Sequence, residues 1–383
     1  MKIVYFYPQF IPHAGTERIL IDKMNYLAGL EGYEVVMLTF EQGTHPVAFS
    51  LSPKVRHIDL DVHYYPYYKQ PRPVRFYRWW QLDKLLRQRY NALMEELRPD
   101  IVITTTYYAT VMETVAQCPT PYAKVLESHI DRRFILSNDP ANRKSLLRWL
   151  HMLRDMHRVV TSARNFDILV ALKQADADDW AKFVKTTVIS NIVHLNDTDT
   201  CSSQEEKRVI FVGRYAPQKG LPSLLQIWKQ VQPLHPDWHL DLYGDGELYE
   251  WLCSEAASLR MNIHVNKPTT NIFNCYRSSS IFVLTSVYEP FGLVMPEAMS
   301  CGLPIVSFDS PSGPAEIITD GVDGFLIPQR DCTLFAQRLD MLMSQPDLRK
   351  QFSQNAIRSS QRFAPERIMP QWTHLFQQLT THP

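Results

Sequence analysis

The stretch from Glu289 to Pro304 constrains the fold more than any other part of the chain. A short apolar run, residues 280–285, precedes it, and another, residues 303–308, closes it, and runs of this length are typical of buried parallel strands. Gly292 permits a turn after the first run, and Gly302 supplies a helix stop before the second. The stretch therefore predicts a β-α-β unit in an α/β protein.

The turn in this unit has the composition of a ligand site. In open α/β sheets, ligands bind beyond the carboxyl ends of the strands, where backbone N–H groups at a helix start face the crevice. We expect the amides of Phe291, Gly292 and Leu293 to lie there, bracketed by the carboxylates of Glu289 and Glu297. Such a site offers acceptors for hydroxyls and donors for anionic oxygens. The alternative is that both glutamates are ordinary solvated carboxylates.

The spacing of these residues resembles a known signature. A Glu-x7-Glu pair enclosing Phe-Gly, followed by Glu-Ala-Met and Gly-x-Pro, is similar to the signature of the retaining glycosyltransferases of family 4. The resemblance is strong from residue 209 to 327 and patchy before 191. It implies a GT-B fold, in which two Rossmann-like domains face a cleft and a C-terminal helix crosses back to the first. The string at residues 309–318 looks like a variant from bacterial members that build lipid-linked or surface polysaccharides.

Composition excludes some classes of protein. The 383 residues carry 40 basic and 40 acidic side chains, so there is no bulk attraction to nucleic acid. Six cysteines lack metal-ligand spacing and suit reduced thiols in a cytosol. No apolar run approaches the ~18 residues of a membrane span. We expect a cytoplasmic protein, at most peripheral on the inner face of a membrane.

A polar stretch, residues 196–206, predicts a linker. We therefore expect an N-terminal domain over residues 1–195, completed by a C-terminal helix over 366–383, and a second domain over 196–365. The resemblance implies that the first domain takes the acceptor and the second the sugar nucleotide.

Two features of the first half are candidate site residues. Gly15 follows a first strand and precedes an amphipathic run, with Thr16 as the expected helix N-cap, and in the resembling family this loop faces the donor diphosphate. His129 follows the buried-looking strand at residues 123–127. A lone histidine is most often structural, whereas the resemblance places it near the donor sugar.

Residues 63–80 interleave aromatic and basic side chains. This pattern suits an anionic membrane surface or a phosphate-bearing lipid acceptor. The alternative is an ordinary surface whose aromatics pack inward and whose arginines are solvated. The residues that would make the contact are Arg72, Arg75, Arg78, Trp79 and Trp80.

The second half opens with a strand followed by a cationic loop that contains Gly213, Arg214 and Lys219. A guanidinium with bidentate geometry and a mobile ammonium are suited to a diphosphate leaving group. The loop also matches the resembling family's Gly-Arg…Lys-Gly motif. Gly244 ends the next strand, and the resemblance places it near the nucleotide base, although backbone shape explains it equally well.

These residues predict transfer of a hexose or N-acetylhexosamine from a nucleoside diphosphate sugar, with UDP favoured by the resemblance, to a hydroxyl of a glycan or lipid-linked acceptor. Arg214 and Lys219 would stabilise the leaving group, Glu289 would hold donor-sugar hydroxyls and Glu297 the ribose hydroxyls. We expect no metal and no other cofactor. Two alternatives are a nucleotide-sugar epimerase of the same fold and a non-catalytic sugar-nucleotide-binding protein.

Overall fold

The computed structural model describes residues 1–11, 14–132, 146–198, 200–310 and 313–381, with the backbone alone for residues 146–151. The chain divides into two compact units. Unit 1 comprises Met1–Ile192 and Ile368–Pro383, and unit 2 comprises Val193–Arg367. The division falls three residues before the boundary that the polar stretch suggested.

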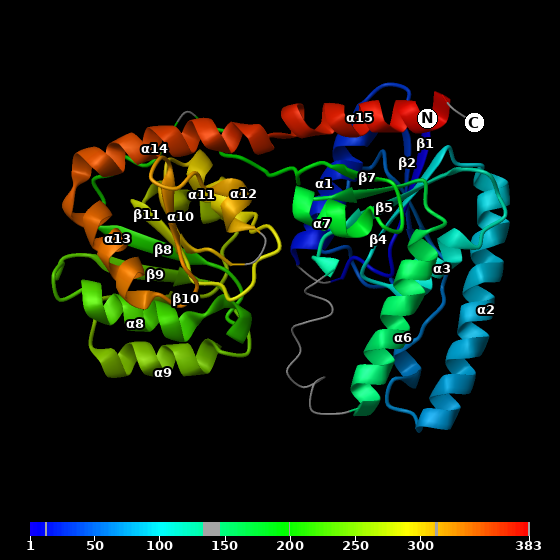
Figure 1. Ribbon diagram of the computed structural model, residues 1–383, viewed down its shortest axis with the longest axis horizontal. Coiled ribbons are helices and arrows are strands. Elements are labelled where there is room, and N and C mark those ends of the chain that lie inside the picture. Colours follow the sequence, from blue (N-terminus) through cyan, green and yellow to red (C-terminus); the bar gives the residue numbers. More distant parts are fainter. Residues whose placement is uncertain (12–13, 133–145, 199, 311–312, 382–383) are drawn as a thin grey trace. The chain divides into compact units, whose positions relative to one another are not determined.

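Unit 1 is built around a parallel sheet, in which the described residues form seven strands in the order β3-β2-β1-β4-β5-β6-β7 (Figure 1). Its strands are β1 (Lys2–Phe6), β2 (Glu34–Thr39), β3 (Arg56–Asp59), β4 (Ile101–Thr105), β5 (Ala123–Ser128), β6 (Ile168–Ala171) and β7 (Thr186–Val188). Its helices are α1 (Gly15–Gly29), the short η1 (Tyr65–Tyr67), α2 (Arg72–Leu97), α3 (Ala109–Ala116), α6 (Leu146–Ala163), α7 (Gln174–Trp180) and most of α15 (Pro365–Thr381).

Unit 2 repeats this plan. Its described residues form a six-stranded parallel sheet in the order β10-β9-β8-β11-β12-β13. The strands are β8 (Arg208–Val212), β9 (His239–Tyr243), β10 (Ile263–Asn266), β11 (Ile281–Leu284), β12 (Ile305–Phe308) and β13 (Gly324–Ile327). The helices are η2 (Pro217–Lys219), α8 (Leu221–Val231), α9 (Tyr249–Leu259), α10 (Ile272–Arg277), α11 (Val294–Ser300), α12 (Pro314–Ile317), α13 (Cys332–Ser344), α14 (Pro346–Ser360) and η3 (Gln361–Phe363). Both units are therefore Rossmann-like, as the resemblance implied.

In both sheets the strand order reverses beside the first strand of the unit. The reversal lies between β1 and β4 in unit 1 and between β8 and β11 in unit 2. The two connections that leave a pair of strands at such a point run to opposite sides, so the loops part and leave room for a ligand. The fold thus marks one place in each unit where a site is expected.

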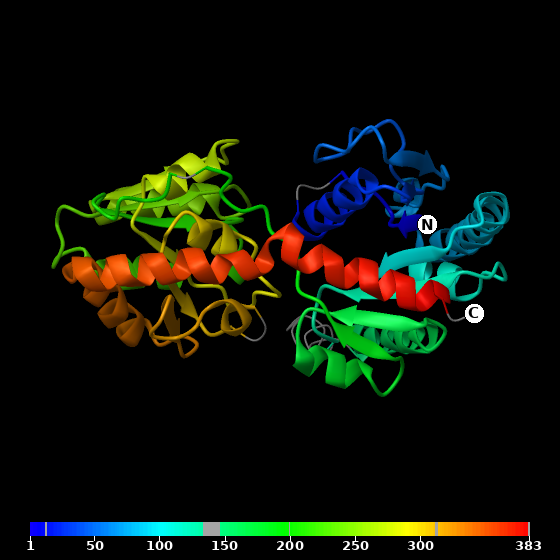
Figure 2. The same ribbon diagram turned by 90° about the horizontal axis from the view of Figure 1, so that it is seen from above.

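The C-terminal helix completes the core of unit 1. Trp372, Leu375 and Phe376 of α15 are buried in the same apolar cluster as residues of α1, and Figures 1 and 2 show the two helices side by side. These residues recur at helical spacing, so they form one buried face of the helix. Trp372 also lies under the ammonium group of Lys23 from α1, which is 4.1 Å from the ring centroid.

The β-α-β unit around Glu289–Pro304 forms as its residues predicted. Gly292 has a positive φ of 88°, which permits the turn, and Pro296 lies in the first turn of α11. After α11, Gly302 is left-handed, its N–H bonds to Met299 and the N–H of Leu303 bonds to Ala298. This is the Schellman arrangement, which satisfies the last carbonyl groups of a helix.

The described part of the polar stretch, residues 196–198 and 200–206, is attached to unit 2 by hydrogen bonds. The backbone N–H of Asn196 donates to Ser300 Oγ, at the end of α11. Gln204 is buried: its side-chain amide donates to the Gly302 carbonyl, and its backbone carbonyl accepts from Arg349. The composition of the stretch predicted a linker and gave no sign of these contacts.

We predict that Gly244→Ala destabilises unit 2. A Cβ at this position would lie 2.0 Å from the carbonyl oxygen of Gly213, so the two backbones would have to separate. Overpacking of this kind costs about 1–3 kcal/mol. Urea unfolding measures the loss.

Gly29→Ala, at the end of α1, is the matched control because a Cβ there meets nothing within 4 Å. It should unfold at the wild-type midpoint or slightly above. Equal midpoints for Gly244→Ala and wild type would contradict the packing argument.

Candidate functional site

Two loops meet at the strand reversal of unit 2. One follows β8 and contains residues 213–220, and the other follows β11 and contains residues 285–293. The N–H of Val287 donates to the carbonyl of Gln218 at 2.8 Å, and the Gln218 side chain donates to the carbonyl of Tyr288 at 2.8 Å. Between them, Thr285 Oγ1 donates to the carbonyl of Lys219 at 3.0 Å. Three hydrogen bonds thus hold the loops together.

Gly220 allows this close approach. Its φ is +64°, and a Cβ would lie 2.0 Å from the carbonyl oxygen of Thr285. Any larger residue would force the two loops apart. The Lys-Gly pair in the cationic loop is therefore explained by backbone geometry as well as by charge.

Lys219 and Glu289 form an ion pair between the loops. Lys219 Nζ lies 2.5 Å from Glu289 Oε2, and Ser286 Oγ donates to the same oxygen at 3.1 Å. The side chains are only 16% and 8% exposed. An ammonium group has three N–H donors, and within the described residues Lys219 gives a hydrogen bond only to Glu289. Lys219 can therefore hold Glu289 and bind an anionic oxygen at the same time.

Arg214 differs from Lys219. It lies on the same loop but is exposed, and its side chain forms no hydrogen bond or ion pair with any residue that the structure describes. Gly213 beside it packs closely on the Phe211 ring, from which a Cβ at this position would lie 3.3 Å. The loop thus presents one anchored cation and one solvated cation.

Glu297 lies on α11 and is buried. Its Oε2 accepts a hydrogen bond of 3.3 Å from the hydroxyl of Tyr276, a buried residue of α10. The backbone N–H groups of Phe291, Gly292 and Leu293, just before α11, donate to no residue in the described ranges. The structure therefore gathers the expected amides and carboxylates at the carboxyl end of β11.

In unit 1, Gly15 is the first residue of α1. The expectation that Thr16 caps this helix is wrong. Ala14 occupies the N-cap position and supplies no side-chain hydrogen bond, while Thr16 Oγ1 lies 3.5 Å from the hydroxyl of Tyr107 on a loop after β4. The tertiary partner outweighs the local capping preference of threonine.

His129 belongs to a buried group of three ionisable side chains. Its Nε2 lies 2.8 Å from Glu127 Oε2, and the same oxygen accepts a hydrogen bond from Lys23 Nζ. The side chains of Glu127 and His129 are each 3% exposed. Lys23 and Trp372 extend this group to α1 and α15. The histidine is thus neither lone nor solvated.

Electrostatic interactions within this buried group shift the pKa values of its members. Burial alone would raise the pKa of Glu127, but the nearby Lys23 ammonium and the hydrogen bond from His129 outweigh it and lower that pKa. Burial lowers the pKa of Lys23, and Glu127 offsets only part of that effect. Burial, with Glu127 nearby, also raises the pKa of Tyr5 on β1. The ionised Glu127 is the centre of the group.

The aromatic and basic residues of the first half lie on η1 and the start of α2, whose first turns project past the end of the sheet (Figure 1). Trp80 is 58% exposed, whereas Trp79 is half-buried between the Tyr68 ring and the core. Of the two tryptophans named for the contact, Trp80 is therefore exposed and Trp79 packs partly inward. We call the following group the aromatic–arginine surface, in which all residues are exposed except the half-buried Arg75: Tyr65, Tyr68, Phe76, Tyr77, Trp80, Arg72, Arg75 and Arg78.

No helix in the described residues is both long and apolar enough to cross a bilayer. Nor do three or more His, Cys, Asp or Glu side chains in those ranges gather as a metal ion would require.

Comparison with known proteins agrees with this geometry. Residues 197–359 match the family described as Glycosyl transferases group 1. An uncharacterized glycosyltransferase of Haemophilus influenzae is 29% identical over 97% of this chain and 98% of its own length. The amylovoran biosynthesis glycosyltransferase AmsD of Erwinia amylovora is 36% identical over 47% of this chain and 51% of its own.

The fold agrees over the whole length as well. The crystal structure of HepE from Anabaena, in complex with UDP and glucose, aligns with a TM-score of 0.70 at 19% identity, covering 99% of this chain and 100% of that one. The chain is a glycosyltransferase with the GT-B fold.

Sequence reasoning missed several residues of this glycosyltransferase. Ser286 and Gln218 support the Lys219–Glu289 pair, and neither stands out in the sequence. Lys23 could have been found, because it falls on the apolar face of α1 with Leu20 and Leu27. A charge at a core position indicates a buried partner.

We predict that Glu127→Gln flattens the acid dependence of stability. The folded-state pKa of Glu127 is lowered, so its contribution is present above the unfolded pKa of about 4.3 and is lost as pH falls through the folded pKa. At neutral pH the variant should lose about 3–5 kcal/mol, because Lys23 stays buried without its counter-charge. Urea midpoints between pH 7 and pH 3 measure both effects.

Glu95→Gln, at an exposed position of α2, is the control and should follow the wild-type curve. Parallel curves for Glu127→Gln and wild type would show that folding does not shift the pKa of Glu127 and would contradict this account.

Proposed function

We propose that this glycosyltransferase belongs to the retaining family 4 and moves a hexose or N-acetylhexosamine from a UDP-sugar to a hydroxyl of a glycan or lipid-linked acceptor. The observation that carries the proposal is the pairing of Lys219 with Glu289 beside exposed Arg214, where the sheet of unit 2 reverses. UDP is favoured by the resemblance and by the UDP bound in the HepE structure.

The chemistry follows from the leaving group. When the diphosphate departs, the anomeric carbon becomes cation-like and negative charge develops on the phosphate oxygens. Preorganised cations and N–H donors aimed at that charge supply the largest catalytic effect in such sites. On this proposal Arg214 and Lys219 bind the diphosphate, and Lys219 also orients Glu289 toward donor-sugar hydroxyls.

The remaining contacts are assigned by position. Glu297 would take the ribose hydroxyls, and the amides of residues 291–293 would take sugar or phosphate oxygens. In unit 1 we retain the roles that the resemblance gives to two residues, a diphosphate contact for Gly15 and a donor-sugar contact for His129. Since the cations already neutralise the leaving group, the proposed reaction needs no metal.

A panel of UDP-, GDP- and ADP-sugars, each with and without EDTA, tests the function. Acceptor-dependent release of UDP, unchanged by EDTA, is the expected result. A new sugar nucleotide would indicate an epimerase instead. Binding without turnover would indicate a non-catalytic protein.

We predict that Arg214→Ala and Lys219→Ala each lower kcat by roughly 10²–10³, by analogy with the loss of a preorganised oxyanion donor. The two variants should differ in melting temperature. Arg214 has no described partner, so its removal should leave the melting temperature unchanged, whereas loss of Lys219 leaves Glu289 unpaired and should lower it.

Lys229→Ala, at an exposed position of α8 in the same unit, is the control and should behave as wild type. Full activity in both the Arg214 and the Lys219 variants would refute the diphosphate site.

We also propose that the aromatic–arginine surface makes peripheral contact with the inner face of the membrane. Arg72, Arg75 and Arg78 form no ion pair with a described residue, so their charge is available to an anionic surface. Exposed aromatic rings between them suit the interfacial region of a bilayer.

We predict that the triple variant Arg72→Gln, Arg75→Gln, Arg78→Gln loses affinity for anionic vesicles. Each arginine near an anionic surface contributes about 1 kcal/mol, so the partition coefficient should fall roughly 100-fold. Co-sedimentation with phosphatidylglycerol-containing vesicles measures it.

The matched triple Lys182→Gln, Lys229→Gln, Arg358→Gln removes the same charge from exposed positions elsewhere. Equal binding by the two triple variants would show that the three arginines of this surface are ordinary solvated charges with no special role in membrane binding.

A further inference from the structure

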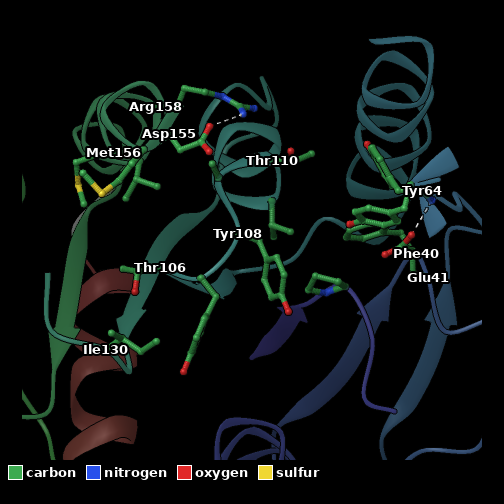
Figure 3. Close-up of a pocket in the computed structure, with 17 residues that line it drawn as sticks. Phe40, Glu41, Tyr64, Thr106, Tyr108, Thr110, Ile130, Asp155, Met156 and Arg158 are labelled. Carbon is green, nitrogen blue, oxygen red and sulfur yellow. Dashed lines mark hydrogen bonds and ion pairs between the residues drawn. The ribbon is translucent and has the colours of Figure 1, made fainter. Parts of the chain in front are cut away.

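A cavity of about 820 Å³ lies at the strand reversal of unit 1, and all of its lining residues belong to that unit (Figure 3). Pro8, after β1, and residues 106–111, after β4 and at the start of α3, form part of its wall. It therefore occupies the same place in its sheet as the Lys219–Glu289 loops do in theirs. Nothing in the proposed donor chemistry uses it.

The cavity has two unlike walls. Figure 3 shows Asp155, Met156 and Arg158 of α6 on one side, and Phe40, Glu41 and Tyr64 on the other. The Tyr108 side chain projects between them, and the residue is 41% exposed. Its ring meets the Tyr7 ring edge-on at 5.4 Å, and this contact fixes its direction.

Aromatic rings with carboxylates at the edges are suited to a saccharide. A sugar ring has apolar C–H faces that pack on aromatic rings, and hydroxyl groups around its edge that donate to carboxylates. Glu41 uses Oε1 to accept from the backbone of Tyr64 and Tyr65, while Oε2 bonds to no residue in the described ranges. Asp155, whose side chain is 63% exposed, faces it from the other wall.

The charge inside the cavity disfavours an anionic ligand. Its cation, Arg158, makes bidentate contact with Glu113 at 2.6 and 2.7 Å and lies 3.6 Å from Asp155. Two carboxylates therefore already neutralise the guanidinium. Glu41 adds a negative charge, and so the cavity suits a hydroxyl-rich neutral group.

The rim of the cavity carries positive charge, in contrast to its interior. Tyr68 lines the cavity and also belongs to the aromatic–arginine surface. Its ring contacts Trp79 at 5.5 Å, and the Arg75 guanidinium lies 5.3 Å above that tryptophan and donates to the Tyr68 carbonyl. A ligand that leaves the cavity past Tyr68 therefore meets cations and exposed aromatic side chains.

We propose that this cavity is the acceptor site and that the acceptor is a saccharide carried on a lipid through a phosphate or diphosphate. The saccharide occupies the space between Tyr108, Glu41 and Asp155. The phosphate lies against the arginines outside Tyr68, and the lipid stays in the membrane that the aromatic–arginine surface contacts. This inference rests on the proposed function.

The transfer step balances without a further reactant. An acceptor hydroxyl oxygen forms a bond to the anomeric carbon of the donor, and the bond from that carbon to the diphosphate breaks. The bonding electron pair leaves with the diphosphate, whose oxygen takes up the hydroxyl proton. The products are the extended lipid-linked glycan and the nucleoside diphosphate.

The test uses the full-length protein, the donor that the panel identifies in radiolabelled form, and membranes of the source organism. We expect the label in the fraction that organic solvent extracts and that mild acid releases, as for a sugar joined to a lipid by diphosphate. Label confined to water-soluble products would overturn the proposal.

Variants locate the site. Tyr108→Ala and Asp155→Asn should each raise the KM for membrane acceptor about tenfold, with the KM for donor unchanged. Tyr108→Phe keeps the ring and should stay within about twofold of wild type. Asp178→Asn, at an exposed position of α7, is the control for the charge.

The outcomes separate the two proposals. Absence of nucleotide release from every donor by the wild-type protein would refute the proposed function. Normal transfer with unchanged acceptor KM in both Tyr108→Ala and Asp155→Asn would refute this acceptor site alone.

Discussion

The ion pair between Lys219 and Glu289 is the interaction on which the proposed donor site depends. A largely buried pair of charges is stable only when hydrogen bonds surround it, because each charge gives up its hydration. Ser286 supplies one such bond, and three more hydrogen bonds join the loops that carry the pair. Since the loops leave the sheet from adjacent strands, the strand order itself brings the two charges together. Gly220, which has no Cβ to hold the loops apart, makes the distance possible.

Unit 1 uses buried charge in a comparable way. Lys23 on α1 and His129 after β5 both bond to one carboxylate oxygen of Glu127. Trp372, on a helix that the chain reaches only after completing unit 2, covers the ammonium of Lys23. Folding of the first 192 residues alone would leave this group without its cover. The C-terminal helix is therefore part of the electrostatics of unit 1 as well as of its apolar core.

Local patterns predicted local structure well. The turn at Gly292, the helix stop at Gly302 and the buried face of α15 all follow from residues a few positions apart. The features that local patterns did not predict depend on contacts between residues that are distant in the sequence. Thr16 does not cap α1, and its hydroxyl lies beside that of Tyr107 instead. The composition of the polar stretch likewise gave no sign that Asn196 bonds to α11 and Gln204 to α14. The Lys23–Glu127 contact spans 104 positions, and the cavity around Tyr108 combines segments from six regions of unit 1. No periodic pattern in the sequence predicts contacts between residues so far apart along the chain.

The central claim is that unit 2 binds a sugar nucleotide by its diphosphate through two cations and by its hydroxyls through two carboxylates. A crystal structure of the protein with bound UDP tests it most directly. We expect Arg214 and Lys219 within hydrogen-bond distance of the phosphate oxygens, with Glu297 at the ribose and Glu289 still paired with Lys219. A complex in which UDP lies elsewhere, or in which these side chains face away from it, would contradict the account.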